Sequence, residues 1–551
     1  MSNLKSRGTV VNIAETLKQA VAEKADQVGL IEAGTGSSVT FAQLDRRSDG
    51  YAAYLKDRGV CAGDTVILMV TPSAEFICLT FALFKLGAPV VLIDPGMGYK
   101  NLLTCIERVN PRVLIGIPKA LLFKKIFPRP FRTVKKTFCC GKTFGLLGPD
   151  IRDCISGSIE PFSLFQPKDK DLAAIIFTTG STGPPKGVRY EHSVFAAQLR
   201  LIRDYYQIGP DDVDQPAFPL FALFSTALGA CSVIPDMDPT RPALVDPAKF
   251  VDSIKKYRVT YSFGSPAIWN VVSKYCLEKQ IVLQSISKIL MAGAPVPYEL
   301  LQRVSAILPE NAVIFTPYGA TESLPIASIT GQEILTDTWE ESRVGKGTCV
   351  GRSLPGIEIR ILEISDQPIL EYKKELELGA YCIGEIVVKG DVVTRSYEGN
   401  PDETQFAKIL EDGEFWHRMG DVGYLDDLGR LWFCGRKAHR VQLQDTTLYT
   451  IPCEAIFNEH RDVYRSALVG CFLKDERSQT PVIIVEPYGD KHLNPAALIE
   501  EVKLLALSSK LTRVIDHFLI YDSFPVDIRH NAKIFREKLA LWAQKKLSVQ
   551  I

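Results

Sequence analysis

Apolar positions along the first part of the chain alternate between two spacings. Between about residues 10 and 330, segments of helical period alternate with short β-branched runs. The helix-like stretch 253–257 leads into the strand-like run 259–263, for example, and the run 286–291 leads into a glycine-containing turn at 293–295. Helices that alternate with strands indicate crossover connections between parallel strands. We therefore predict an α/β fold whose large N-terminal part has parallel-rich sheets covered by helices.

The pattern changes near residue 345. Short strand-like runs at 357–361, 384–390 and 430–433 are separated there by glycine-rich turns, which predicts a compact β subdomain at about 345–434. Beyond Gly435 about 115 residues remain, enough for a small separate domain. We predict an N-terminal domain over 1–434, which includes the β subdomain, and a small mobile α+β lid over 435–551.

One long apolar stretch raises the question of a membrane span. Residues 76–93 form the most apolar long segment, but it contains Lys85, Gly87 and Pro89. A buried helix followed by a strand explains this run better than a transmembrane helix does. The first 21 residues lack the charged-then-apolar pattern of a secretory signal and predict an amphipathic helix. No transmembrane segment is expected.

Composition narrows the class of protein further. Lys+Arg and Asp+Glu number 64 each, so no overall positive field attracts nucleic acid, and no nucleic-acid partner is expected. The 13 cysteines include no C-x-x-C pair, so neither a zinc site nor a disulfide framework is predicted. Reduced thiols in a cytoplasmic enzyme of two or three domains fit these numbers.

The strongest local signal is the run TTGSTGPPKG at 178–187. It follows an apolar strand-like run at 173–177, and a helix is predicted to begin near His192. Glycines let the backbone approach a ligand closely, and hydroxyls, backbone N–H groups and an ammonium can then surround a polyphosphate. A lone cluster of this kind also occurs in surface hairpins. The predicted phosphate loop comprises Thr178, Thr179, Gly180, Ser181, Thr182, Gly183 and Lys186.

Four further motifs follow in a fixed order. They are YGATE at 318–322, MGD at 419–421, Gly435-Arg436, and a late lysine in NAKI at 531–534. Together with the phosphate loop, this order resembles the adenylate-forming superfamily of acyl-CoA synthetases, peptide-synthetase adenylation domains and luciferases. The resemblance covers essentially the whole chain. It implies that a carboxylic acid reacts with ATP, with Mg²⁺ as cofactor, to give acyl-AMP and pyrophosphate.

The resemblance implies a role for each matching residue. Glu322 matches the magnesium ligand, since a hard cation prefers carboxylate oxygen, and Thr321 matches a phosphate-binding hydroxyl. Asp421 matches the residue that accepts hydrogen bonds from the ribose hydroxyls, and Arg436 matches a residue that reaches the same sugar or a phosphate. Lys533 matches the lysine that bridges the attacking carboxylate and the α-phosphate. The residues expected around the adenine are Gly293, Ala294, Pro295, Tyr318 and Gly319. Taken singly, Thr321 and Asp421 are also ordinary cap or turn residues, and Lys533 an ordinary surface lysine.

Several positions depart from the family pattern. The hinge position two residues after Arg436 is Ala438, and no glycine occurs between Gly435 and Glu454, which puts a coenzyme A passage in doubt. Ala532 replaces the glycine that precedes the late lysine. Ala222 stands where many acyl-CoA synthetases have histidine. Around it, the phenylalanines either line an apolar acyl site or form ordinary core: Phe218, Phe221 and Phe224.

These departures resemble one branch, the β-lactone synthetases of bacterial long-chain olefin biosynthesis. That resemblance implies a 2-alkyl-3-hydroxy fatty acid whose own hydroxyl attacks the activated carboxyl, so that no external acceptor is needed. A fatty acyl-CoA ligase is the alternative, and an inactive adenylate-binding protein is a third reading. The sequence names no base for the hydroxyl. His192 is a weak candidate and is also explained as the first residue of a helix.

The segment 119–144 combines eight Lys/Arg and five Phe without any Asp or Glu. Such a segment could rest on an anionic bilayer or dock on a partner enzyme, which would suit an oily substrate. The enzyme would then be cytoplasmic but peripherally membrane-associated or part of a multi-enzyme assembly. Alternatively, the segment is a solvated loop whose phenylalanines fold back on the body.

Overall fold

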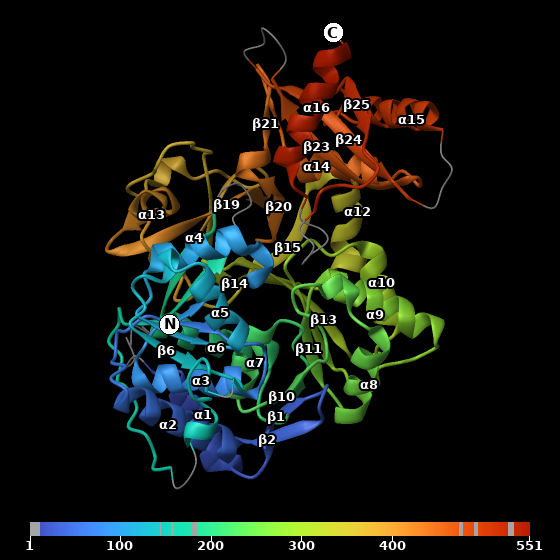
Figure 1. Cartoon of the computed structure of the whole chain (residues 1–551). Helices are drawn as coiled ribbons and strands as arrows, with labels where there is room; N and C mark the ends of the chain where they lie inside the picture. Colours follow the sequence, from blue (N-terminus) through green and yellow to red (C-terminus); the bar gives the residue numbers. More distant parts are fainter. Residues whose placement is uncertain are drawn as a thin grey trace, which may run out of the picture.

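The computed structural model describes residues 11–143, 145–155, 159–178, 184–472, 478–489, 494–526 and 534–550. Residues 179–183 of the predicted phosphate loop, together with Phe144 and Lys533, lie outside this part of the chain. A large body contains the first two helices at its base, and a smaller lobe carries the last helices at the opposite end (Figure 1).

The N-terminal part of the large body is built on a six-stranded sheet. Its strands, in spatial order, are β6 (Lys136–Cys139), β5 (Val113–Gly116), β3 (Val66–Met69), β4 (Val90–Leu92), β7 (Leu172–Thr178) and β8 (Lys186–Glu191). All neighbours pair in parallel except β7 and β8. The apolar stretch 76–93 is the buried helix α3 (Ala74–Leu86) followed by β4, as the sequence predicts.

A second, larger sheet runs through the rest of the body. Its fourteen strands, in spatial order, are β16 (Glu358–Leu362), β17 (Gly384–Lys389), β19 (Glu414–Leu425), β20 (Leu431–Arg436), β15 (Thr348–Ser353), β14 (Ser323–Thr330), β13 (Val313–Ala320), β12 (Lys288–Met291), β11 (Tyr261–Gly264), β9 (Val213–Asp214), β10 (Cys231–Ile234), β1 (Val28–Glu32) and β2 (Ser37–Thr40), with β18 (Lys408–Glu411) beside β19. The run from β13 through β10 to β1 is parallel, and the remaining pairs are antiparallel.

The strands of the predicted β subdomain are not a separate sheet. Strand β15 pairs with β14, with Ala327 opposite Ser353, and with β20 on its other edge. Backbone hydrogen bonding therefore continues from the parallel strands into the β-rich segment. A sequence pattern shows where strands lie but not which edges pair, so this continuity is not visible before folding.

Helices cover the sheets and connect their parallel strands. Besides α3, the longer ones in this body are α1 (Ala14–Lys24), α2 (Phe41–Asp57), α4 (Tyr99–Val109), α5 (Pro118–Ile126), α6 (His192–Tyr206), α7 (Pro219–Ala227), α8 (Pro247–Tyr257), α9 (Pro266–Glu278), α10 (Tyr298–Ala306) and α13 (Pro401–Ala407). Helix α2 begins with a capping box, in which Thr40 and Gln43 satisfy each other's backbone N–H groups.

The smaller lobe has its own three-stranded sheet. Strand β23 (Val463–Cys471) pairs with β24 (Thr480–Pro487), which pairs in parallel with β25 (His517–Ile520). Helices α14 (Thr450–Asn458), α15 (Pro495–Ser508) and α16 (Arg536–Gln550) pack around it, and β21 (Val441–Gln442) with β22 (Thr447–Leu448) forms a short hairpin. The apolar side chains form two cores that are separate from those of the large body.

The segment 119–144 is part of the large body rather than a protruding loop. It supplies α5 and the edge strand β6, with Phe131 and Phe138 buried and Phe123 and Phe127 half-buried. These four phenylalanines therefore fold back on the body, and the exposed apolar side chains are instead Leu122 and Ile126 of α5.

Two further expectations concern thiols and membranes. All 13 cysteines are free thiols, in agreement with the absence of a disulfide framework. Among the described residues, none of the helices is both long and apolar enough to cross a membrane.

Candidate active site

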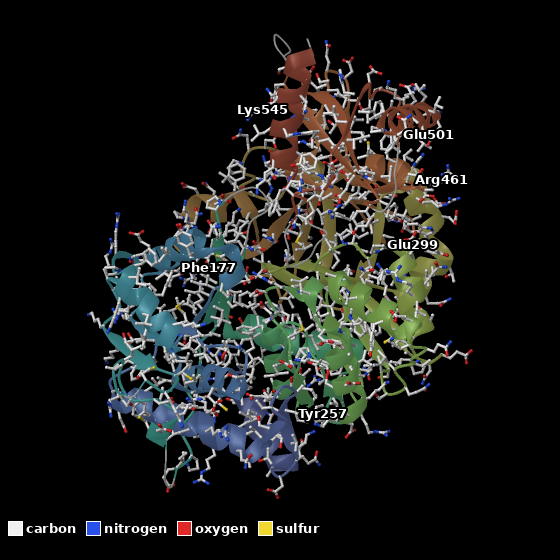
Figure 2. The ribbon with its side chains drawn as sticks, turned by 45° about the vertical axis from the view of Figure 1, so that its right-hand side comes forward. Phe177, Tyr257, Glu299, Arg461, Glu501 and Lys545 are labelled. Atoms are coloured by element: carbon white, nitrogen blue, oxygen red, sulfur yellow. The ribbon has the colours of Figure 1, made fainter. Side chains whose placement is uncertain are left out.

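A cavity of about 1280 Å³ opens where strands of the two sheets end. Met69, Leu92 and Phe177 line it from the ends of β3, β4 and β7, and Gly264 and Tyr318 from the ends of β11 and β13. Figure 2 labels Phe177 within the large body, whereas Glu501 and Lys545 lie in the smaller lobe. Clefts outside the carboxyl ends of parallel strands are the usual ligand sites of open α/β sheets, so the fold itself places a site here.

Lys186 reaches the cavity from the first position of β8. Its backbone lies opposite Thr178 on β7, so the predicted phosphate loop is the connection of an antiparallel pair. The ammonium lies 2.5 Å from a carboxylate oxygen of Glu403 and over the ring of Tyr397 at 5.4 Å. The sequence position of Lys186 suggests that the phosphate loop carries it. In the structure it is instead the first residue of strand β8.

Glu322 and Thr321 sit at the tip between β13 and β14, and both line the cavity. The Tyr397 hydroxyl donates to a Glu322 carboxylate oxygen at 2.7 Å. The Glu322 carbonyl accepts from both the backbone N–H and the hydroxyl of Thr394, at 2.9 and 3.0 Å. A firmly held, half-buried carboxylate that faces a cavity suits a hard divalent cation that keeps waters and phosphate as its other ligands.

The buried Asp421 is bound by two partly exposed residues, Arg436 and Tyr318. Asp421 lies opposite Arg436 across the β19–β20 pair, with 2.8 Å between carboxylate oxygen and guanidinium nitrogen, and the Tyr318 hydroxyl donates to the other oxygen. Burial raises the pKa of Asp421, and Arg436 and Tyr318 partly offset this effect. Arg436 and Tyr318 line the cavity, whereas Asp421 lies behind them.

The residues expected around the adenine are only partly at the cavity wall. Gly293, which follows β12 with a φ of +96°, and Gly319 line it, but Ala294 and Pro295 do not. A side chain at Gly319 would meet the Ser323 carbonyl oxygen at 2.7 Å, so the close β13–β14 packing there requires glycine.

One arm of the cavity is aromatic. Phe218, Phe221 and Phe224 of the α7 region all line it, and the Phe221 ring stacks on Phe263 with 3.6 Å between centroids. Ala222 is fully buried and lies away from the cavity, because it is on the opposite face of α7. The site therefore has no histidine at this position of the wall.

A second apolar part of the cavity wall, here called the second arm, comes from the six-stranded sheet and α5. Ile67 and Met69 of β3, Leu92 of β4, and Ala120 and Phe123 of α5 line it. The helix that begins the basic segment 119–144 is therefore part of the cavity wall.

Sequence reasoning missed several polar residues near the cavity. His417 lines it; burial lowers the pKa of this imidazole well below its usual value, and Nδ1 lies 3.2 Å from the Ala407 carbonyl oxygen. Burial lowers the pKa of Lys408 to about 7, and its ammonium donates to the carbonyl of Thr394. The only feature of the sequence that could have indicated His417 as a site residue is its position close to Asp421 in the chain.

The segment that joins the body to the smaller lobe also borders the cavity. Ala438 lines it, and the neighbouring Lys437 ammonium lies 3.1 Å from Glu385. Glu385 is already paired with the buried Arg418 at 2.7 Å. Arg440 forms an ion pair with Asp366. Two ion pairs thus fasten this segment to the β-rich part of the body.

His192 is not placed for catalysis. It is the first residue of α6, fully buried, and packs edge-on against Phe84 with 6.0 Å between ring centroids. It does not line the cavity. His192 is therefore the first residue of a helix, and its interpretation as a base for the substrate hydroxyl is wrong. Burial lowers the pKa of His192 to about 4.

The family described as AMP-binding enzyme matches residues 17–398 of this chain. The chain belongs to the AMP-binding enzyme family. The olefin beta-lactone synthetases of Stenotrophomonas maltophilia and Xanthomonas campestris are 41% and 42% identical to it, covering 97% and 98% of this chain and 98% of each relative. The amide bond synthetase McbA from Marinactinospora thermotolerans has the same fold, with a TM-score of 0.78 at 22% identity over 96% of this chain and 99% of McbA.

These likenesses confirm the resemblance that the motif order indicated. The AMP-binding enzyme is an adenylate-forming enzyme with the predicted α/β body and smaller C-terminal domain. The roles of individual residues, the domain boundary at 434–435 and the mobility of the C-terminal domain stay predictions.

Proposed function

We propose that this AMP-binding enzyme uses ATP to activate a long-chain 2-alkyl-3-hydroxy fatty acid as its acyl-AMP and then closes the acid into a β-lactone. The near-complete alignment with two olefin beta-lactone synthetases, at 41% and 42% identity, is the observation that carries the proposal. The two apolar parts of the cavity wall, one on each sheet, agree with it, because an acid with two alkyl branches needs apolar surface for both.

Activation brings two anions together, so positive charge has to gather where they meet. Lys186 would hold the terminal phosphates, and Lys533 would bridge the carboxylate and the α-phosphate. Glu322 and the hydroxyl of Thr321 would hold Mg²⁺ and phosphate, and bound Mg²⁺ would neutralise phosphate charge as a Lewis acid. Arg436 and Tyr318, held together by Asp421, would contact the ribose and adenine.

Ring closure needs no second substrate. The 3-hydroxyl oxygen attacks the activated carbonyl carbon, the bond from that carbon to the phosphate oxygen breaks, AMP leaves, and the hydroxyl releases its proton. A cavity that fixes both branches limits rotation about the bond between C2 and C3 and so holds the hydroxyl near the carbonyl. The segment fastened by Lys437 and Arg440 supports a reaction completed without coenzyme A.

The test compares products with and without coenzyme A. The enzyme is incubated with ATP, Mg²⁺ and a 2-alkyl-3-hydroxy acid, and mass spectrometry identifies the products. We expect the lactone, AMP and pyrophosphate in both reactions. A thioester as the sole product, formed only with coenzyme A, would instead identify a fatty acyl-CoA ligase. Absence of acyl-AMP, lactone and thioester would leave an adenylate-binding protein. Lys533→Ala should abolish acyl-AMP formation while ATP binding persists.

The exposed face of α5 supports a peripheral location for a cytoplasmic enzyme. Leu122 and Ile126 are 48% and 67% exposed, Lys119 and Lys125 lie beside them, and the inner face of this helix lines the cavity. An anionic bilayer or a partner enzyme would deliver an oily acid there. Deletion of 119–144 would remove strand β6, so the test is the double variant Leu122→Gln/Ile126→Gln in vesicle and partner sedimentation. Sedimentation equal to that of the unaltered protein would contradict this location.

A further inference from the structure

The aromatic arm of the cavity ends at a definite depth within the large sheet. On β11 the cavity is lined by Gly264, Phe263 and Tyr261, and on β12 by Leu290. Among the described residues, none earlier on these two strands lines it. Tyr261 precedes Gly264 by three residues, so the arm descends about 10 Å from the strand ends where the nucleotide is expected.

The end of this arm is polar, although its walls are apolar. Asp214 lies opposite Tyr261 across the β9–β11 pair, and Tyr206 is the last residue of α6. Both line the cavity, and they are only 1% and 2% exposed. Ser225 donates to one carboxylate oxygen of Asp214. The other oxygen, and the hydroxyl of Tyr206, have no partner within hydrogen-bond distance in the described part of the chain, and the polar groups that face them are the side chains of Tyr261 and Ser328, respectively.

A buried carboxyl with one free oxygen is unusual in an apolar pocket. Buried polar atoms are normally hydrogen-bonded, so these two require a water molecule or a polar ligand atom. Burial raises the pKa of Asp214 well above its usual value, with Ser225 and Tyr261 partly offsetting the effect, so the neutral acid is favoured. A neutral acid and a phenol can each hydrogen-bond a water through their donors and acceptors.

We propose that Asp214 and Tyr206 form a hydrated polar floor that limits the length of one alkyl branch of the substrate. This inference rests on the proposed function. A terminal methyl group that reached the floor would displace water from these two polar groups and place an apolar group against them. The branch in this arm therefore stops short of Asp214. The second arm has no such floor among its described lining residues, so the other branch is not limited in this way.

The test compares two series of 2-alkyl-3-hydroxy acids. One series lengthens only the branch on C2, and the other lengthens only the chain beyond C3. We expect kcat/KM for ATP–pyrophosphate exchange to fall sharply beyond one length in a single series, by roughly tenfold per further methylene. Tyr206→Phe and Asp214→Val should each move that limit to a longer chain in the same series, whereas Asp214→Asn, which keeps a polar floor, should retain it.

The substitutions are chosen to preserve the fold. Tyr206→Phe removes a single hydroxyl, and valine is favoured in a strand. Ser225 keeps a partner in Asp214→Val, because its hydroxyl also donates to the Phe221 carbonyl at 2.8 Å. Thermal melting checks each variant.

Two results would overturn the inference. One is an unchanged limit in both Tyr206→Phe and Asp214→Val, and the other is an equal shift in both series. Calorimetric binding of the same acids without ATP separates this inference from the proposed function. A length limit in binding that moves with Tyr206→Phe supports the polar floor even when no acid is activated, and a binding limit that stays in place refutes it.

Discussion

Asp421 and Arg436 face each other across the β19–β20 pair, and their charged groups lie 2.8 Å apart. Asp421 also accepts from Tyr318 and lies behind both partners, so it positions two cavity residues at once. A single carboxylate therefore couples the expected ribose contact to the expected adenine contact.

Asp421→Asn tests this coupling. The substitution keeps the shape but removes the charge that holds Arg436, whose side chain is 38% exposed, so that solvent screens the pair. We expect ATP affinity to fall by about fivefold, which corresponds to about 1 kcal/mol. Equilibrium binding of ATP measures the loss, and thermal melting separates it from unfolding. Unchanged ATP affinity in a folded variant would refute this role.

We expect Glu403 to compete with phosphate for Lys186, because the two side chains form an ion pair. The carboxylate is 41% exposed in its side chain, so the pair is worth about 0–1 kcal/mol. Glu403→Gln should free the ammonium and lower KM for ATP by about two- to fivefold. Lys186→Met should raise the same constant. Steady-state kinetics at fixed ionic strength measures both, and a higher KM in Glu403→Gln would show that this carboxylate helps binding.

His192 makes stability depend on pH. Its pKa of about 4 in the folded state is below the unfolded value, so the unfolded chain binds the extra proton between about pH 6.5 and 4. Stability is therefore lost as the pH falls through this window, with a slope of at most about 1.4 kcal/mol per pH unit. His192→Leu should reduce that slope in urea denaturation and leave the pH profile of activity unchanged. A changed activity profile would return His192 to the catalytic candidates.

We expect Lys437 and Arg440 to limit rotation of the smaller lobe. Their ion pairs with Glu385 and Asp366 fasten the joining segment, and Ala438 offers no polar substitute. We expect little change in the small-angle scattering profile when an acyl-adenylate analogue binds. Lys437→Met leaves Glu385 paired with Arg418 and should enlarge the change.

Lys503, which pairs with Glu500 on α15, supplies the matched control. Lys503→Met should give the same small-angle scattering profile as the unaltered protein, both with and without the acyl-adenylate analogue. A large change in the scattering profile of the unaltered protein on binding of the analogue would contradict the proposal that these ion pairs limit rotation of the smaller lobe.

The chemistry could be predicted from the sequence because the residues of each motif are close together in the chain and the motifs follow one another in a fixed order. Alternating helical and β-branched spacing likewise predicted the parallel sheets, since that spacing reflects which faces are buried. TTGSTGPPKG, YGATE and MGD needed no tertiary contact to be noticed. The same holds for the free cysteines and for the buried helix followed by a strand at 76–93.

Only the tertiary structure decided which distant side chains meet. Glu403 lies 217 positions beyond Lys186. Asp214 meets the aromatic arm through the pairing of β9 with β11, and Tyr206 meets it from the end of α6. The sequence around His192 fits both a catalytic base and the first residue of a helix. Its burial against Phe84 excludes the catalytic role. Local patterns record which residues favour a strand, a turn or an anion, whereas edge pairing, cavity depth and ion-pair partners depend on how the whole chain packs.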